Sequence, residues 1–254
     1  MLSPTNSPDA PAPIPPSRVQ ALPIKTWETP LVTYTLIAIT GISFLLQLAG
    51  QYLLGEDFAA MWGMKVNELV VSGQFWRLIT PVLLHGSILH IGFNMYALLS
   101  LGPGLERLYG HARFIALYLL AGFAGNVLSF WFSPNPSLGA STAIFGLLGA
   151  EGVFLYRNRT ILGAGAQRAL SNIVVIAVVN LIIGLSPGID NWGHIGGLIA
   201  GTLFAWFAGP VFQTRGDFYS QNIVDQHSET RAAWTALAVW ALFSILAGLR
   251  ILLG

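Results

Sequence analysis

The segment GASTAIFGLLGAEGVFLY, residues 139–156, joins a serine to an apolar run long enough to enter a membrane. Ser141 stands at the start of that run. A second apolar run opens with GHIGG, residues 193–197, which places His194 at its beginning. Hydrocarbon contains no water that could hydrogen-bond to polar groups, so a serine and a histidine at such positions indicate function.

The composition is that of an integral membrane protein. Of the 254 residues, 54% are hydrophobic and only 9% are charged, against about 25% charged in a soluble domain. The net charge of +1 gives no reason to expect a nucleic-acid partner, and the absence of cysteine excludes disulfides and thiol catalysis. We expect residues 1–30, which are rich in proline and lack an apolar run, to form a disordered cytoplasmic tail and no signal peptide.

Apolar segments long enough to cross a bilayer predict an all-α polytopic membrane protein. We expect the first six to form a core over residues 31–212, followed by a cytoplasmic linker over 213–231 and a seventh transmembrane helix over 232–254. The seven expected spans are 31–54, 87–101, 114–132, 141–156, 170–185, 191–212 and 232–253.

The apolar stretch from residue 75 to residue 101 is too long for one crossing. Gly86-Ser87 offers a break followed by a helix cap. We therefore expect residues 75–85 to lie in an outer, partly interfacial segment, with Trp76-Arg77 as its anchor at the level of the lipid headgroups.

The distribution of basic residues predicts a cytoplasmic N-terminus. In that orientation nine of the twelve basic residues lie inside and three, Lys65, Arg77 and Arg250, lie outside, in agreement with the positive-inside rule. The expected second, fourth and sixth spans then all run inwards. Their first turns, which carry His90 and Asn94, Ser141, and His194, should meet at one depth just below the outer surface.

These four residues could together perform acyl transfer. A neutral imidazole can activate a serine hydroxyl, so Ser141 and His194 form a candidate nucleophile and base. His90 and Asn94, four residues apart on one helix face, and the Ser141 amide at a helix start could stabilise an oxyanion. Gly139 would allow close backbone approach, and Gly197 and Gly201 would form a small-xxx-small face that brings the sixth span against the fourth.

Each of these residues also has a structural interpretation. Ser141 could cap its helix, His194 could pack against a carbonyl, and His90 with Asn94 could join neighbouring helices. For His85 we favour a structural role in the outer segment. A metal site built from histidines would lack a neighbouring carboxylate, so we expect no metal.

Two carboxylates need separate consideration. Glu151 lies about 15 Å along the helix from Ser141, so we expect it to snorkel or to pair with Arg157 near the inner surface. Asp190 precedes His194 by four residues. It could orient the imidazole, but a loop or cap carboxylate is the interpretation we favour.

At these residues the chain resembles the rhomboid family of intramembrane serine proteases. The family's Trp-Arg element and its H-x-x-x-x-H-x-x-x-N, G-x-S-x-x-x-F-G and His-glycine motifs occur in order over about residues 31–212. The matching residues are Trp76, Arg77, His85, His90, Asn94, Gly139, Ser141, Phe145, Gly146, His194, Gly197 and Gly201.

The resemblance implies a Ser141–His194 dyad that cleaves transmembrane protein substrates in or near the bilayer without a cofactor. It also implies an oxyanion hole of His90, Asn94 and the Ser141 amide, and packing of Phe145 beside the His194 ring. The seventh helix resembles the six-plus-one arrangement of many bacterial members. We accordingly expect a bacterial plasma membrane, with the active site towards its outer side.

The resemblance to rhomboids implies that substrates enter beside the fifth span. Ser186-Pro187-Gly188 breaks that helix before the loop that leads to His194. We expect Leu181, Ile182 and Leu185 to form part of a gate packed against the second span. Two other functions remain open, a non-catalytic binder of transmembrane clients and a transporter, whereas the substrate and the oligomeric state stay undetermined.

Overall fold

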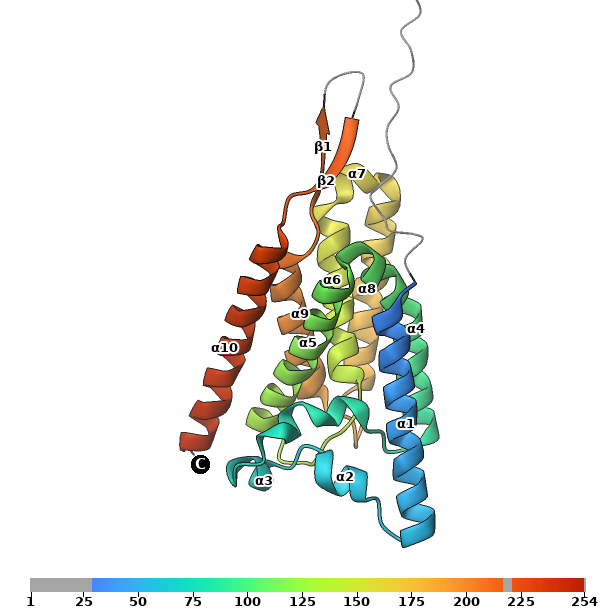
Figure 1. Cartoon of the computed structure of the whole chain (residues 1–254), viewed down its shortest axis with the longest axis vertical. Helices are drawn as coiled ribbons and strands as arrows, with labels where there is room; N and C mark the ends of the chain where they lie inside the picture. Colours follow the sequence, from blue (N-terminus) through green and yellow to red (C-terminus); the bar gives the residue numbers. More distant parts are fainter. Residues whose placement is uncertain (1–28, 217–220, 254) are drawn as a thin grey trace, which may run out of the picture.

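The computed structural model describes residues 29–216 and 221–253, and these form a bundle of helices with one small hairpin (Figure 1). The proposed tail of residues 1–30 lies almost entirely outside the described residues. Seven helices of 17 residues or more occur in the described part of the chain. They are α1 (Leu31–Leu54), α4 (Ile88–Tyr109), α5 (His111–Phe132), α6 (Ser141–Arg157), α8 (Ala164–Ile183), α9 (Asn191–Ala208) and α10 (Glu229–Leu253).

Five of these helices are long and apolar enough to cross a membrane: α1, α4, α5, α8 and α10. The other two, α6 and α9, carry Ser141 and His194 and open with small or polar residues. The fold is therefore that of an all-α polytopic membrane protein with a six-helix core and a seventh helix after it.

Short elements connect the long helices at both ends of the bundle. Between α1 and α4 the chain forms α2 (Phe58–Gly63), α3 (Asn67–Val71) and the 3-10 helices η1 (Phe75–Leu78) and η2 (Thr80–Leu83). At the opposite end lies α7 (Arg159–Leu162) together with the antiparallel hairpin of β1 (Phe212–Gly216) and β2 (Gln221–Asp225). The expected linker thus contains regular structure, and α10 begins three residues before the expected seventh span.

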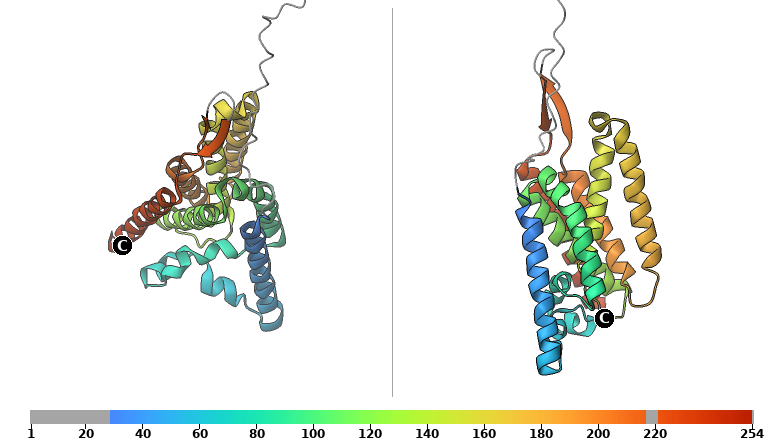
Figure 2. Two further views of the ribbon diagram at one scale, coloured as in Figure 1. Left: turned by 45° about the horizontal axis from the view of Figure 1, so that its top comes forward. Right: turned by 90° about the vertical axis from the view of Figure 1, so that its right-hand side faces the viewer.

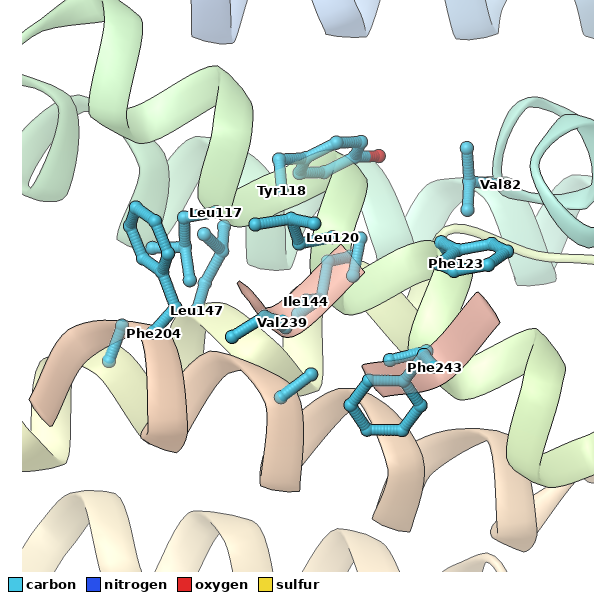
Figure 3. Close-up of a cluster of buried hydrophobic side chains, with 14 of the residues drawn as sticks. Val82, Leu117, Tyr118, Leu120, Phe123, Ile144, Leu147, Phe204, Val239 and Phe243 are labelled. Atoms are coloured by element: carbon cyan, nitrogen blue, oxygen red, sulfur yellow. The ribbon is translucent and has the colours of Figure 1, made fainter. Parts of the chain in front are cut away.

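The core is centred on α5, which packs against both α6 and α9. Side chains from several elements meet there (Figure 3), among them Val82 of η2, Phe123 of α5, Ile144 of α6, Phe204 of α9 and Phe243 of α10. In contrast, α8 lies at the edge of the bundle, opposite α1 (Figure 2). It carries exposed Val175, Val179 and Ile182, as expected for a helix that faces lipid.

Helix ends are set by local signals that the sequence contains. The Ser87 hydroxyl accepts a hydrogen bond from the amide of His90 and caps α4, as expected from the Gly86-Ser87 break. The Asp190 carboxylate caps α9 by accepting from the Gly193 amide. The two caps lie at the same end of the bundle as the start of α6 (Figure 1), so the polar residues of the three first turns come together.

Candidate active site

Ser141 and His194 form a hydrogen-bonded pair. The Ser141 Oγ lies 2.9 Å from the His194 Nε2, across the contact between the first residue of α6 and the fourth residue of α9. His194 is buried and Ser141 is half-buried. The pair therefore joins a hydroxyl to an imidazole nitrogen that could accept its proton.

Glycines allow the two helices to approach closely enough for this contact. A Cβ on Gly197 would overlap the carbonyl oxygen of Thr142, and one on Gly201 would overlap that of Gly146. The small-xxx-small face of α9 thus lies directly on the backbone of α6, at the position expected from the sequence. The same contact fixes the height of His194 relative to Ser141.

The His194 ring is held by packing, with no hydrogen bond to its second nitrogen from the described residues. Phe145 stacks on the imidazole with a centroid distance of 4.3 Å and an interplanar angle of 11°. The buried Nδ1 has no hydrogen-bond partner in the part of the chain that the structure describes. Asp190 instead receives hydrogen bonds from the Gly193 amide and the Ser129 hydroxyl, which is the cap role that we favoured.

Gly139 brings the backbone close to His90. Its φ of +136° is a conformation that residues with a Cβ rarely adopt, and a Cβ there would lie 2.7 Å from the His90 Nε2. His90, Asn94 and Ser141 line one cavity with Gly139. The Asn94 Nδ2 donates to the His90 carbonyl at 2.9 Å, so one of its two N–H groups is already engaged.

His85 contacts two residues next to the candidate dyad, His90 and Ala140. It is buried, its ring meets the His90 ring edge-on at 4.9 Å, and its Nε2 lies 3.4 Å from the Ala140 amide that donates to it. Burial lowers the pKa of His85 to about 3, so the ring is neutral and able to accept this hydrogen bond. This contact fits the structural role that we favoured for His85.

A cavity of about 1060 Å³ opens beside the dyad. Its walls include Phe93 and Ala97 of α4 and Ile176 and Asn180 of α8, besides the dyad itself. The space therefore separates α4 from α8 on the side of Ser141. A volume of this size accommodates an extended peptide segment of several residues as well as water.

The expected gate residues occupy different environments. Leu181 packs against the cluster of Phe145, Leu148 and Ile173. Ile182 is 62% exposed and Leu185 is 76% exposed, so these two do not pack against α4 as expected. The reason is that α8 leans on α6 and the cavity intervenes between α8 and α4.

Arg77 does not anchor the outer segment at the headgroups, which corrects the expectation for that one residue of the Trp76-Arg77 pair. Its guanidinium is buried and donates to the carbonyls of Met61 and Met64 and to the Gln74 side chain. Arg77 thereby closes the loop between α2 and η1. The hydrogen bonds to these acceptors offset the desolvation cost of burying the Arg77 charge.

Lys65 joins the end of α5 to the loop that leads to Ser141. Its side chain is fully buried, and its Nζ donates to the Ser133 carbonyl at 3.1 Å, just beyond α5. Its backbone pairs with Ser137, in the loop that leads to Ser141. Burial lowers its pKa to about 8, although Asp190 acts in the opposite direction. Sequence alone offered no signal, because the partners are backbone carbonyls distant along the chain.

The expected pairing of Glu151 with Arg157 is wrong. In the described part of the chain it forms no ion pair, and its Oε2 has no hydrogen-bond partner. Arg157 instead donates to the Trp206 carbonyl at 3.0 Å and lies over the Trp206 ring. The Arg157 guanidinium therefore hydrogen-bonds to the C-terminal end of α9 and not to the Glu151 carboxylate on its own helix.

Comparison with known proteins connects this geometry to a family. The model of the Rhomboid domain matches residues 72–211, which include both members of the dyad. Rhomboid protease GluP of Bacillus subtilis (strain 168) is 45% identical over 174 residues, which are 68% of this chain and 34% of that protein.

Two plant proteins are also similar. RHOMBOID-like protein 9, chloroplastic, of Arabidopsis thaliana is 32% identical over 73% of this chain and 43% of its own length. RHOMBOID-like protein 4 of the same plant is 40% identical over 58% of this chain and 37% of its own length. The chain thus spans between a third and a half of the length of these curated relatives.

Proposed function

The chain belongs to the rhomboid family, and we propose that it is an intramembrane serine endopeptidase that cleaves membrane proteins in or near their transmembrane segments. The observation that carries the proposal is the 2.9 Å contact between the Ser141 Oγ and the His194 Nε2 in a wide cavity. Its proposed partners are transmembrane protein substrates within a lipid bilayer.

In the proposed reaction His194 moves one proton in each direction. Its Nε2 takes the Ser141 proton while the Oγ attacks the scissile carbonyl carbon, and the charge passes to the carbonyl oxygen. The imidazolium then gives the proton to the leaving amine, and the C–N bond breaks. Water repeats the sequence on the acyl ester, which releases the carboxylate product and restores Ser141.

The developing oxyanion needs donors that are already in position. The Ser141 amide belongs to the first turn of α6, so the helix does not use it. The His90 ring and the remaining N–H of Asn94 line the same cavity. We assign these three groups to the oxyanion hole. Gly139, Gly197 and Gly201 support the site by allowing close backbone approach, and Phe145 supports it by stacking on His194.

We propose that residues 31–212 form the catalytic core, with residues 213–231 and the seventh helix after it. The proposed orientation has a cytoplasmic N-terminus in a bacterial plasma membrane and the dyad towards the outer side. In its support, Arg107, Arg113, Arg157 and Arg159 all lie at the end of the bundle opposite the dyad.

A non-catalytic binder of transmembrane clients is the second candidate. The cavity between α4 and α8 would suit a client helix without any chemistry. The hydrogen-bonded dyad favours the protease, because a binder has no use for a serine activated by histidine.

One experiment separates these two functions. The full chain in detergent is incubated with a dye-labelled transmembrane peptide and, in parallel, with a fluorophosphonate probe. We expect two peptide fragments and a covalent adduct on Ser141, both lost in Ser141→Ala and His194→Ala. A parent protein that binds the peptide but yields neither fragments nor adduct would overturn the protease and favour the binder.

A further inference from the structure

A second groove lies at the end of the bundle opposite the dyad. It has a volume of about 710 Å³ and runs between the last turns of α9 and the first half of α10. One end of it is lined by Ser228, Thr230 and Arg231. The remainder is lined mostly by apolar residues, with Thr235 as its polar member, and comprises Leu203, Phe207, Trp234, Thr235, Ala238, Val239 and Leu242. The groove therefore pairs one polar, cationic end with an apolar channel.

Arg231 has binding capacity left after its protein contacts. Its Nε donates to the Phe207 carbonyl at 2.7 Å, which fixes the guanidinium at the groove. Its two terminal nitrogens make no hydrogen bond or ion pair with the described residues. A guanidinium held in this way presents a fork of N–H donors suited to phosphate oxygens.

The nearby acidic groups do not neutralise Arg231. The carboxylates of Asp225 and Glu229 pair with Arg113, at 2.7 and 3.0 Å. Arg157 lies near the same end of α9, and among the described residues it contacts only the Trp206 carbonyl and ring through its guanidinium. The local charge is therefore positive in the described part of the chain, which favours an anionic ligand.

The surroundings identify the depth of the groove in the bilayer. Trp234, which lines it, is 67% exposed, and exposed tryptophans are enriched at the interface between headgroups and hydrocarbon. From there the apolar residues continue along α10 towards the middle of the membrane. An acyl chain could follow them while a headgroup phosphate meets Arg231.

We propose that the groove between α9 and α10 binds an anionic phospholipid, with the phosphate on Arg231 and the hydroxyls of Ser228 and Thr230. One acyl chain lies along Phe207, Val239 and Leu242. In the orientation favoured by the basic residues this lipid belongs to the inner leaflet. The site is separate from the dyad and does not depend on the proposed protease activity.

The test measures lipid retention by native mass spectrometry of the full chain. The protein is mixed with equal amounts of phosphatidylglycerol and phosphatidylcholine that carry identical acyl chains. We expect the parent to retain phosphatidylglycerol preferentially. Arg231→Gln should reduce that preference about tenfold, because a hydrogen bond between charged groups is lost. Arg168→Gln is the matched control, since Arg168 is exposed at the same end of the bundle and lies outside the groove.

A second pair of variants tests the apolar channel. Ala238 lines the groove and is exposed, so Ala238→Trp should fill it and lower retention of the lipid without changing any charge. Ala233→Trp, on the same helix and outside the groove, should retain lipid like the parent. Circular dichroism checks that every variant is folded.

A thermal assay distinguishes a lipid from a free phosphate compound. Phosphatidylglycerol should raise the Tm of the parent and of Arg168→Gln, but not that of Arg231→Gln. Glycerol phosphate at the same concentration should have no effect. Equal stabilisation by glycerol phosphate, or parent-like retention of phosphatidylglycerol by both Arg231→Gln and Ala238→Trp, would overturn the proposal.

Discussion

At the scale of single residues, the position of Asp190 decides whether a carboxylate orients the His194 imidazole as a third member of the site. The carboxylate caps α9 and accepts from Ser129, while the His194 Nδ1 has no partner in the described part of the chain. The His194 ring is instead oriented by stacking on Phe145. These contacts favour the proposed dyad of Ser141 and His194 over a triad that includes Asp190.

Asp190→Asn provides the test, because asparagine can still cap a helix. We expect kcat/KM to fall by less than about tenfold, whereas a carboxylate that orients a catalytic histidine is worth about 10⁴ in rate. Asp190→Ala should in addition lower stability by about 1 kcal/mol through loss of the cap. A loss of three or more orders of magnitude in Asp190→Asn would show that the carboxylate belongs to the catalytic machinery.

Lys65 leads to a prediction about pH. Burial lowers its pKa to about 8 in the folded protein, from 10.5 in the unfolded chain. Between these values the unfolded chain binds more protons, so the free energy of unfolding should rise as the pH increases from about 8 to about 10.5. Below pH 8 both states are protonated and the full cost of burying the charge is present.

The measurement compares the Tm of the parent with that of Lys65→Met at pH 7 and at pH 10. Methionine has a similar length and no proton to lose, so other titrating groups cancel in the difference. We expect the difference to shift in favour of the parent at pH 10. A difference that is the same at both pH values would contradict the lowered pKa.

At the scale of elements, α9 is fixed from both of its ends. Near its start, Gly197 and Gly201 lie on the backbone of α6. At its other end three arginines donate to three consecutive carbonyls, Arg157 to Trp206, Arg231 to Phe207 and Arg113 to Ala208. These carbonyls have no partner within the helix, and positive charge is favourable at a helix C-terminus. Movement of His194 along its helix axis is therefore restrained.

Gly197→Ala should disturb this arrangement more than its small size suggests. The added methyl group meets the Thr142 carbonyl, which is backbone and cannot rotate away. We expect the Tm to fall by roughly 3–10 °C, as for overpacked cores of this size. Cleavage should fall by about 10²-fold, because small displacements of a catalytic group are costly.

Gly41→Ala is the matched control. Gly41 lies in the middle of α1, and a Cβ there would meet nothing within 4 Å. Alanine is about 1 kcal/mol better than glycine within a helix, so this variant should be unchanged or slightly stabilised. Equal effects of the two substitutions would argue against the close approach of α9 to α6.

The long helices were predictable because hydrocarbon imposes a minimum length and strong apolarity on each span. The common location of the polar residues at the helix starts was also predictable. The spans alternate in direction, so the starts of the second, fourth and sixth spans, which carry His90, Asn94, Ser141 and His194, lie at the same end of the bundle. The hairpin of β1 and β2 was not predicted. Its strands are short, and its base is held by long-range contacts, such as that of Arg113 with Asp225, which produce no periodic pattern.

Contacts between charged side chains and distant carbonyls were equally invisible in the sequence. Arg77 and Lys65 counted as outer basic residues, yet both are buried and bound to backbone oxygens. Pairing of Arg157 with Glu151, six residues away, was one of two expectations for that carboxylate, but Arg157 donates to a carbonyl of α9 instead. Such pairings depend on which elements become neighbours in three dimensions.

At the scale of the whole molecule, the orientation in the membrane is directly testable. The chain contains no cysteine, so single cysteines report without background. Asn135 and Gln167 are both exposed, and they lie at opposite ends of the bundle. In intact cells an impermeant maleimide should label Asn135→Cys and spare Gln167→Cys, with both reacting after lysis. The reverse pattern would place the dyad on the cytoplasmic side.

The arrangement of α4, α8 and the cavity suggests a route for substrate. In the part of the chain described, α8 contacts α6 extensively but has little contact with α4. The cavity beside Ser141 lies between these two helices. A transmembrane segment could therefore enter sideways through this gap. The exposed Ile182 and Leu185 would then line its path, without having to separate from α4.

Cross-linking α4 to α8 should close that route. Ala97 and Ile176 both line the cavity, one from each helix, so a variant with cysteines at both positions can be joined by a short bis-maleimide. We expect the joined protein to lose cleavage of a transmembrane peptide while a small fluorophosphonate still labels Ser141, because the probe does not need the gap. The same variant treated with a monofunctional maleimide controls for the bulk of the reagent. If the joined protein cleaves the peptide at the rate of this control, substrates enter elsewhere, whereas loss of both activities would mean that the link distorts the dyad itself.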